Sequence, residues 1–438
     1  FTEKGFDLLK QGGRLGFICP HKFLNSDFGS GLRTFLAKHL AIESFISFGH
    51  NLVFEQASVY TGILVLRKGC DGKFQYHEIP DIPTAELPVK LNSLQSDDFA
   101  TFSLSDLGSA PWILTSSAGK TVLSRIARPE TPAQEASTLR TTFDNIVVGI
   151  QSGIDRVHIL RFVRSTPNGT LILKSERSGG EVEIEEELVK PLLTGEDVKR
   201  YCKSKATHYC IYPYKLSKSK TLILEETELK ERFPNGYAYL KEYSKELTEI
   251  RKSQKTNPRY WYSCHRGRSM SLFEQVRIIT PEISLGCNMT IDRDGLYHNT
   301  KVYSLLPPFD SAENVYYWLG VLNSKIMWWF LKNTGYVLRG GYFTFKTKYL
   351  EPFPLRRIDF SIPTDKILHD QVVSMVDRTL ELHNRLSIAR TPQEKSTLER
   401  QIVGTDAELD RVVYELYGLT DEEIRIVEGS ASTLSVNV

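Results

Sequence analysis

The first seventy residues alternate short apolar runs with polar turns. Residues 12–20 ("GGRLGFICP") form an apolar run between glycines and a proline, and residues 42–49 and 60–69 are two more runs that predict strands. Residues 31–39 carry apolar side chains at helical spacing. Strand, helix, strand and strand in this order predict half of a doubly wound sheet. Such a sheet needs neighbouring strands that the helix-like residues 1–10 do not supply, so we expect the front of the domain to be missing.

The pattern changes towards the C-terminus. Residues 316–332 ("YYWLGVLNSKIMWWFLK") have apolar positions spaced by three and four, which predicts a core helix more than an aromatic stacking platform. Residues 365–384 and 392–402 predict two antiparallel helices with acidic outer faces, hence a lid or docking bundle. Prolines interrupt residues 79–110, which we expect to be a linker.

Composition limits the class of protein. The chain has 438 residues, of which 41% are hydrophobic and 11% aromatic, enough to bury the cores of two or three domains. No run approaches the roughly 18 apolar residues of a membrane span, and the N-terminus lacks a secretion signal, so we expect a cytoplasmic protein with no membrane partner. The six cysteines form no CxxC pair, and Cys202, His208 and Cys210 lack ligand spacing. We therefore expect buried thiols and no metal.

Charge is distributed unevenly. The net charge is only +2, but residues 359–428 hold 15 acidic and 8 basic residues, which leaves +9 on the rest. Residues 251–268 hold six Lys or Arg and three consecutive aromatics, and residues 335–349 hold three Lys or Arg and five aromatics, both without an acid. Cations neutralise phosphates while aromatic faces and Arg forks meet bases, so both stretches are typical of a DNA surface. A solvated basic face remains the alternative.

A series of segments in a fixed order resembles a known family. Residues 6–69, from "FDLLKQGGRLGFICP" to "SVYTGILVLRKG", are followed by "NIVVGIQSGIDRVHIL" (145–160), "LVKPLLTGEDVKRY" (188–201), residues 239–266, "RIITPEIS" (277–284), "YHNTKVYSL" (297–305), residues 318–332, "RGGYFTFKTKYLEPFPL" (339–355) and "VVYELYGLTDEEIRIVEG" (412–429). Together they resemble the latter half of the catalytic domain, the target-recognition domain and the C-terminal end of TaqI-type adenine-N6 DNA methyltransferases, including the type IIG restriction-modification enzymes.

The resemblance implies an architecture of mixed class, α/β and α+β. It implies the C-terminal half of a Rossmann-like methyltransferase sheet, then a mixed α+β target-recognition domain, then a helical segment. The expected boundaries are 1–78 for the sheet remnant, 79–110 for the linker, 111–358 for the recognition domain, 359–429 for the helical segment and 430–438 for a disordered tail.

The resemblance also implies a function. Enzymes of this family move a methyl group from S-adenosylmethionine to the N6 of an adenine that is flipped out of duplex DNA. This chain is expected to be the DNA-recognition part. It would act with a catalytic or nuclease portion that precedes it. A non-catalytic specificity subunit that works with a separate methyltransferase chain, or a phage-defence methyltransferase, are the alternatives.

We expect this chain alone to lack activity. The catalytic Asn-Pro-Pro-Tyr of the family precedes the segment that residues 1–24 resemble, whereas "NPRY" (257–260) lies within the recognition region and is a look-alike. A cofactor turn needs glycines between a strand and a helix, and "RSGGEVE" (177–183) precedes no clear helix start. "PDIPTAELPVK" (80–90) does not bring two metal-binding acids together, so a nuclease site is not predicted. No catalytic or cofactor-binding residue is nominated.

Candidate DNA contacts follow from the basic stretches and from glycine turns. In the family an aromatic of the late hairpin stacks on the flipped adenine, and Tyr60 is the nearest one here, with ordinary strand packing as the alternative. Gln can pair with adenine and Arg with guanine, and paired glycines let backbone approach DNA. We expect Arg266 and Arg339 to line one cleft that opens towards Tyr60. The full set of expected DNA contacts is Gln151, Ser152, Lys199, Arg200, Lys252, Lys255, Arg259, Trp261, Arg266, Arg268, Arg339, Gly340, Gly341, Tyr342, Lys346 and Lys348.

Overall fold

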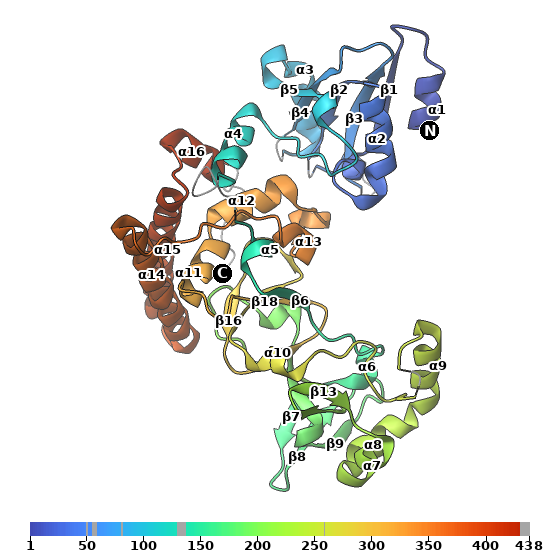
Figure 1. Ribbon diagram of the computed structural model, residues 1–438, viewed down its shortest axis with the longest axis vertical. Coiled ribbons are helices and arrows are strands. Elements are labelled where there is room, and N and C mark those ends of the chain that lie inside the picture. Colours follow the sequence, from blue (N-terminus) through green and yellow to red (C-terminus); the bar gives the residue numbers. More distant parts are fainter. Residues whose placement is uncertain (50, 55–58, 80–81, 129–136, 258, 430–438) are drawn as a thin grey trace. The chain divides into compact units, whose positions relative to one another are not determined.

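The chain forms two compact units, each built from segments far apart in the sequence (Figure 1). Unit 1 comprises Phe1–Ala136, Lys325–Thr344 and Tyr414–Val438, and unit 2 comprises Ser137–Ser324 and Phe345–Val413. Within the described part of the chain, no helix has the length and apolar character needed to cross a membrane. The computed structural model describes residues 1–49, 51–54, 59–79, 82–128, 137–257 and 259–429, so the expected tail lies outside it.

Unit 1 contains a five-stranded mixed sheet. Its strand order is β1-β3-β2-β4-β5, and all neighbours are antiparallel except the parallel pair β2 and β4. The three strands predicted from the first seventy residues are present. The mixed α/β class is therefore confirmed, while the doubly wound arrangement remains a prediction. The strands are β1 (Arg14–Pro20), β2 (Ile42–Ser47), β3 (Thr61–Arg67), β4 (Lys73–Glu78) and β5 (Ala100–Ser103); the short β19 (Phe343–Thr344) also belongs to this unit.

Aromatic side chains fill the core of unit 1. Phe45 stacks on Tyr76 with ring centroids 6.2 Å apart, and Phe74 stacks on Phe102 at 5.6 Å. All four rings are nearly inaccessible to solvent, so they fix β2, β4 and β5 to one another. The helices of this unit are α1 (Thr2–Asp7), α2 (Ser30–Lys38), α3 (Leu87–Ser93), α4 (Ser117–Ile126), α12 (Lys325–Thr334) and α16 (Asp421–Gly429).

The segment expected to be a linker is structured. Residues 79–110 contain α3 and β5, and β5 pairs with β4 in the register Phe74↔Phe102. Pro88 lies in the first turn of α3, where a missing N–H costs nothing. Pro88 therefore marks the start of a helix. Strand β5 has four residues and is too short to show a clear alternation.

Unit 2 is built around two sheets. The six-stranded sheet has the order β17-β10-β11-β7-β8-β9, the four-stranded sheet the order β16-β14-β18-β6, and β12 with β13 forms a separate hairpin. The strands are β6 (Asn145–Val148), β7 (Ile159–Ser165), β8 (Thr170–Lys174), β9 (Glu181–Glu185), β10 (Val189–Leu193), β11 (His208–Ile211), β12 (Tyr214–Ser217), β13 (Lys220–Ile223), β14 (Arg277–Pro281), β15 (Ile283–Ser284), β16 (Thr290–Asp292), β17 (Tyr297–His298) and β18 (Val302–Leu306).

Helices surround these sheets. Helix α8 contacts β9, and α11 contacts the long helix α14. The two helices predicted after Pro354 are confirmed and are longer than expected; α14 and α15 are the two long helices drawn in orange-brown to red in Figure 1. The helices are α5 (Leu139–Thr142), α6 (Asp155–His158), α7 (Glu226–Arg232), α8 (Pro234–Glu242), α9 (Ser244–Gln254), α10 (Met270–Glu274), α11 (Val315–Leu322), α13 (Thr347–Leu350), α14 (Pro363–Ile388) and α15 (Pro392–Leu416).

The predicted core helix over residues 316–332 is interrupted. Helix α11 ends at Leu322 and α12 begins at Lys325. Between them, the side chain of Asn323 accepts a hydrogen bond from the Met289 backbone N–H and donates one to its carbonyl oxygen, both at 3.0 Å. The apolar residues of the segment are buried, as predicted. A polar side chain bound to the backbone just before β16 therefore ends a helix that the apolar spacing alone would continue.

A buried polar cluster lies at the centre of unit 2. Arg277 on β14 and Asp292 on β16 form an ion pair at 2.5 Å in which both side chains are almost fully buried. Arg277 Nε also donates to Ser304 Oγ at 3.0 Å, and His298 Nε2 lies 2.6 Å from the same hydroxyl. The cluster ties β14, β16, β17 and β18 together, so it links the two sheets.

Candidate nucleic-acid interface

Two residues from distant stretches meet in unit 2. Gln151 and Arg266 form an isolated antiparallel bridge, with the Gln151 N–H donating to the Arg266 carbonyl at 3.1 Å and the reverse bond at 3.0 Å. Residues directly opposite in such a pair place their side chains next to each other on one face. Arg266 is exposed and Gln151 is partly exposed. The fold thus sets an amide and a guanidinium side by side at the surface.

Buried contacts hold this backbone in place. The carbonyl oxygen of Ser152 accepts hydrogen bonds from the His265 N–H at 3.1 Å and from Arg251 Nη2 at 2.9 Å. Gly153 has φ of +97°, and a Cβ there would lie 2.3 Å from Arg251 Nη2. A side chain at position 153 would therefore displace the arginine that supports the turn. Ser152 itself is buried and donates to Asp155, so the structure gives it a role in the turn.

A groove of about 710 Å³ opens beside Arg266. One wall is the hairpin formed by β12 and β13, and the other is residues 265–269. None of the described residues that line it is acidic. Burial and the neighbouring Arg251 and Arg266 lower the pKa of His265, so the positive charge of the groove resides on its arginines and lysine. The lining residues are Tyr214, Ser219, Lys220, Thr221, Leu222, Ile223, Asn257, His265, Arg266, Gly267, Arg268 and Ser269.

Two arginines expected to meet DNA are already ion-paired. Arg259 Nη2 lies 2.7 Å from Glu225 Oε2, and that carboxylate also accepts from the hydroxyl of Tyr260. Arg200 is paired with Asp406, and both side chains are largely covered. To bind a phosphate, each arginine would first have to break its ion pair with a carboxylate. This cost reduces the binding free energy that the arginine could contribute.

Arg268 and Lys346 are also engaged. Arg268 Nε donates to the carbonyl oxygen of Val148 at 2.7 Å, and burial lowers the pKa of its guanidinium. Lys346 Nζ lies 3.3 Å from Glu282 Oε1. Arg268 thus stiffens the wall of the groove more than it extends into it.

Three further lysines of the expected set are exposed. Lys252 and Lys255 lie at the end of α9, where Lys255 adopts the left-handed conformation that terminates the helix, and Lys199 lies before Arg200. Within the described residues, none of the three forms an ion pair. They carry charge that remains available to solvent and to phosphates.

The aromatic run at residues 260–262 is largely core. Trp261 is 9% exposed and Tyr262 is fully buried, and both belong to the main apolar cluster of unit 2. The hydroxyl of Tyr262 donates to the carbonyl of Leu224 at 2.6 Å, and Lys241 Nζ lies 5.0 Å from the Trp261 ring centroid. The structure therefore gives Trp261 a packing role, because the apolar cluster and side chains of α8 enclose it. The sequence pattern does not show these contacts.

The remaining candidates lie in or near unit 1. Tyr60 is 4% exposed and its hydroxyl donates to the Leu338 carbonyl at 2.9 Å, so stacking on a base would require this contact to open. Gly340 and Gly341 have φ of +81° and +76°, a left-handed pair that glycine permits. Tyr342 and Lys348, the latter in α13 of unit 2, are exposed. The side chain of Arg339 lies outside the described part, and the cleft expected to join it to Arg266 remains a prediction.

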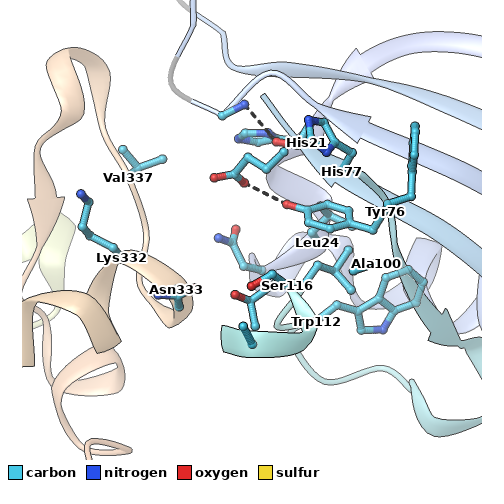
Figure 2. A pocket seen from close by; sticks show the side chains of 18 of the residues that line it. His21, Leu24, Tyr76, His77, Ala100, Trp112, Ser116, Lys332, Asn333 and Val337 are labelled. Carbon is cyan, nitrogen blue, oxygen red and sulfur yellow. Dashed lines mark hydrogen bonds between the residues drawn. The ribbon is translucent and has the colours of Figure 1, made fainter. Parts of the chain in front are cut away.

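Unit 1 has a cavity of its own, of about 650 Å³. The charged residues that line it are three acids, Glu78, Asp97 and Asp98, and one lysine, Lys332, with two histidines. Figure 2 shows His21, Tyr76 and His77 on one wall and Lys332, Asn333 and Val337 on the other. An acidic lining repels phosphate. The acid-free groove of unit 2 therefore fits a nucleic-acid backbone better than this cavity does.

The hairpin wall of the groove was not among the sequence-predicted sites. Its segment "YKLSKSKTLI" (214–223) holds Lys215, Lys218 and Lys220 and no acid. The same acid-free criterion that selected residues 251–268 would have found it. The segment carries a single tyrosine, so it lacks the aromatic content of the two stretches that were selected.

Comparison with known proteins gives two family matches. Residues 190–355 match the TaqI-like C-terminal specificity domain, and residues 1–54 match the Eco57I restriction-modification methylase. The resemblance expected from the sequence is confirmed. The match to a TaqI-like specificity domain thus follows a match to a restriction-modification methylase along the chain.

Relatives are similar along almost the whole chain. It is 27% identical to the type II restriction enzyme and methyltransferase RM.Eco57I of Escherichia coli over 98% of its length, which is 43% of that protein. It is 20% identical to the type II methyltransferase M.BstVI of Geobacillus stearothermophilus over 98% of its length and 68% of that protein. The type IIL restriction-modification enzyme MmeI, solved in complex with DNA, shares the fold with a TM-score of 0.55 at 12% identity, over 99% of this chain and 51% of that one.

Proposed function

We propose that this chain, as the specificity domain and adjoining methylase segment of a type II restriction-modification methyltransferase, recognises a specific duplex DNA site. In the whole enzyme the methyl group of S-adenosylmethionine would pass to the N6 of adenine in that site. The relatives that span the chain are type II methyltransferases, which supports the reaction class. The choice of adenine rests on the resemblance of the sequence to the TaqI type.

One observation carries the proposal for the site. Gln151 and Arg266 are partners in a backbone bridge, and Arg266 lines a groove with no acid among its described lining residues. Arg forms two hydrogen bonds with the O6 and N7 of guanine, and Gln forms two with the N6 and N7 of adenine. Since bridge partners project from the same face, the two side chains can meet neighbouring base pairs. Lys252, Lys255 and Lys199 would contact phosphates and hold the register.

The glycine turn that the sequence offered as a cofactor site does not fit that role. The glycine turn at residues 178–180 joins β8 to β9, and added Cβ atoms at Gly179 would meet nothing within 4 Å. A turn that leads into a strand and faces open space cannot cradle a nucleoside against a helix N-terminus. We therefore assign DNA recognition to this chain and no step of methyl transfer.

The test is sequence selection with the full chain and its Arg266→Ala variant. Duplexes randomised over 12 base pairs are selected for binding, and the enriched site is then titrated by fluorescence anisotropy. We expect Arg266→Ala to lose about 1–3 kcal/mol of binding free energy on that site and to relax selection at one base pair.

Arg259→Ala is the matched control. It removes an exposed arginine of the same segment whose charge Glu225 already neutralises, so we expect unchanged selection. Equal losses for both variants, with unchanged selection, would show that Arg266 reads no base. A chain that selects no sequence at all contradicts the proposal as a whole.

A further inference from the structure

The hairpin wall of the groove has an unusual turn. Strands β12 and β13 are joined by Lys218 and Ser219, with φ of 46° and 65°. A two-residue turn with both central residues at positive φ is the type I′ turn, which favours Asn-Gly because side chains are strained there. Lys218 and Ser219 are both exposed. Local folding alone therefore favours other residues at this tip.

The surface of the hairpin combines charge with apolar contact area. Residues 214–223 contain three lysines and no acid. Leu216 and Leu222 are 43% and 45% exposed, among the more exposed leucines of the chain. Lysine can contact guanine O6 and N7 or a phosphate, and apolar side chains contact the methyl group of thymine. A two-stranded ribbon of this width also fits the major groove of B-DNA, which is about 12 Å across.

The hairpin is anchored at its base and free at its tip. The hydroxyl of Tyr214 accepts from the Cys264 N–H at 3.1 Å, and Lys215 Nζ lies 2.5 Å from Glu228 Oε2. On the other strand, Thr221 Oγ1 accepts from the Met270 N–H at 2.7 Å. These contacts fix both strands to the body of unit 2. The turn therefore projects from a rigid support beside the groove that Arg266 lines on its other wall.

We propose that the β12–β13 hairpin is a ribbon that enters the major groove of duplex DNA. One strand of the duplex then lies in the groove between the hairpin and Arg266, so its phosphates meet Lys220 and Arg266 from both sides. Lys218 at the tip and Leu222 on β13 face base edges. This inference rests on the proposed function and adds the element that reads the site.

The first test changes the tip without endangering the fold. The double variant Lys218→Asn with Ser219→Gly places the favoured residues of a type I′ turn at these positions. We expect the midpoint of thermal unfolding to stay or rise, and the affinity for the duplex selected by the unmodified chain to fall about tenfold or more. Lys230→Asn is the control, because it removes the same charge from an exposed position on α7 that does not line the groove.

The second test distinguishes the grooves of DNA. The selected duplex is rebuilt with 7-deazapurines, which lack the N7 acceptor of the major groove and leave the minor groove unchanged. Binding by the unmodified chain should weaken, and binding by the hairpin variant should weaken less. Insensitivity of the unmodified chain to 7-deazapurines overturns major-groove entry. A hairpin variant that selects the same site with the same affinity overturns the role of the hairpin, while the proposed function stands; a chain that binds no duplex overturns the proposed function itself.

Discussion

Individual arginine residues of this protein serve two purposes: some support the buried backbone, and others are exposed at the surface. Arg33, Arg251 and Arg277 are each no more than 1% exposed, and their guanidinium groups donate to backbone carbonyl oxygens. Arg266 is exposed at a groove. Arg251 and Arg266 belong to the same acid-free stretch, and nothing in that stretch distinguishes them. The difference arises from Gly153 and Ser152, about a hundred residues earlier in the chain, which enclose Arg251.

The buried side chain of His298 predicts how the stability of the protein depends on pH. Burial and the nearby guanidinium groups of Arg277 and Arg268 lower the pKa of His298 to about 3. The unfolded chain protonates this residue near pH 6.5, so the stabilisation is fully present above pH 6.5 and is lost as the pH falls from 6.5 towards 3. We expect the free energy of unfolding to decrease by up to about 1.4 kcal/mol per pH unit from this histidine across that range.

Urea unfolding between pH 7 and pH 4 measures this pH dependence of the free energy of unfolding. The variant His298→Gln keeps a hydrogen-bonding side chain near Ser304 and cannot gain a proton. Its free energy of unfolding should change less steeply with pH than that of the unmodified chain. Parallel pH profiles for the two proteins would mean that His298 does not titrate as its burial requires.

Individual elements show where sequence patterns suffice. Strands β1, β2 and β3 and helix α2 match their predicted ranges, because each is a local run with glycine, proline or polar residues at its ends. Strand β5 and the β12–β13 hairpin were not predicted. Their strands have four residues each, and partners elsewhere in the sheet or groove decide their conformation. The Gln151–Arg266 bridge is likewise a long-range pairing that no local pattern encodes.

The buried ion pair between β14 and β16 gives a prediction at the element scale. Burial raises the pKa of Asp292 even though Arg277 lies beside it, so the pair is held in a costly environment. Asp292→Asn leaves the guanidinium charge buried without its counter-ion. We expect a loss of about 3–5 kcal/mol in the free energy of unfolding, measured with urea at pH 7.

Two further variants check the cause. Arg277→Met combined with Asp292→Leu removes both charges and should be less destabilised than Asp292→Asn. Glu181→Gln breaks an exposed ion pair, in which the side chain of Arg164 is 60% exposed and that of Glu181 is 51% exposed. This change should cost less than about 1 kcal/mol of unfolding free energy. A double variant as unstable as the single one would assign the loss to packing instead of to the uncompensated charge.

At the scale of the whole molecule, a net charge of +2 conceals a division of charge. The helical residues 359–428 are acidic, while the exposed lysines of α9 and the hairpin have no carboxylate partner within the described residues, apart from Lys215. Exposed lysines of this kind attract a polyanion. The salt dependence of DNA affinity, measured for lysine variants, therefore shows which lysines contact phosphate.

Lys252 and Lys255 are the residues to change. If both contact phosphates, their replacement by Ala should weaken binding to all duplexes alike. The slope of log affinity against log salt should flatten by about 0.9 for each lost contact. Lys174→Ala, an exposed lysine of β8 outside the groove, serves as the reference. If the salt slope of this variant equals that of the reference, the two lysines contact no phosphate and belong to a solvated surface.

The order of segments in the two units affects how specificity can change. Unit 2 is made of Ser137–Ser324 and Phe345–Val413, and the intervening Lys325–Thr344 belongs to unit 1. Transplanting unit 2 from a relative would therefore need four chain junctions, and a single genetic crossover would leave at least one unit with a mixed core. If the groove reads DNA as proposed, point substitutions in its walls avoid this problem and are the more accessible route, in nature or by engineering, to a new target sequence.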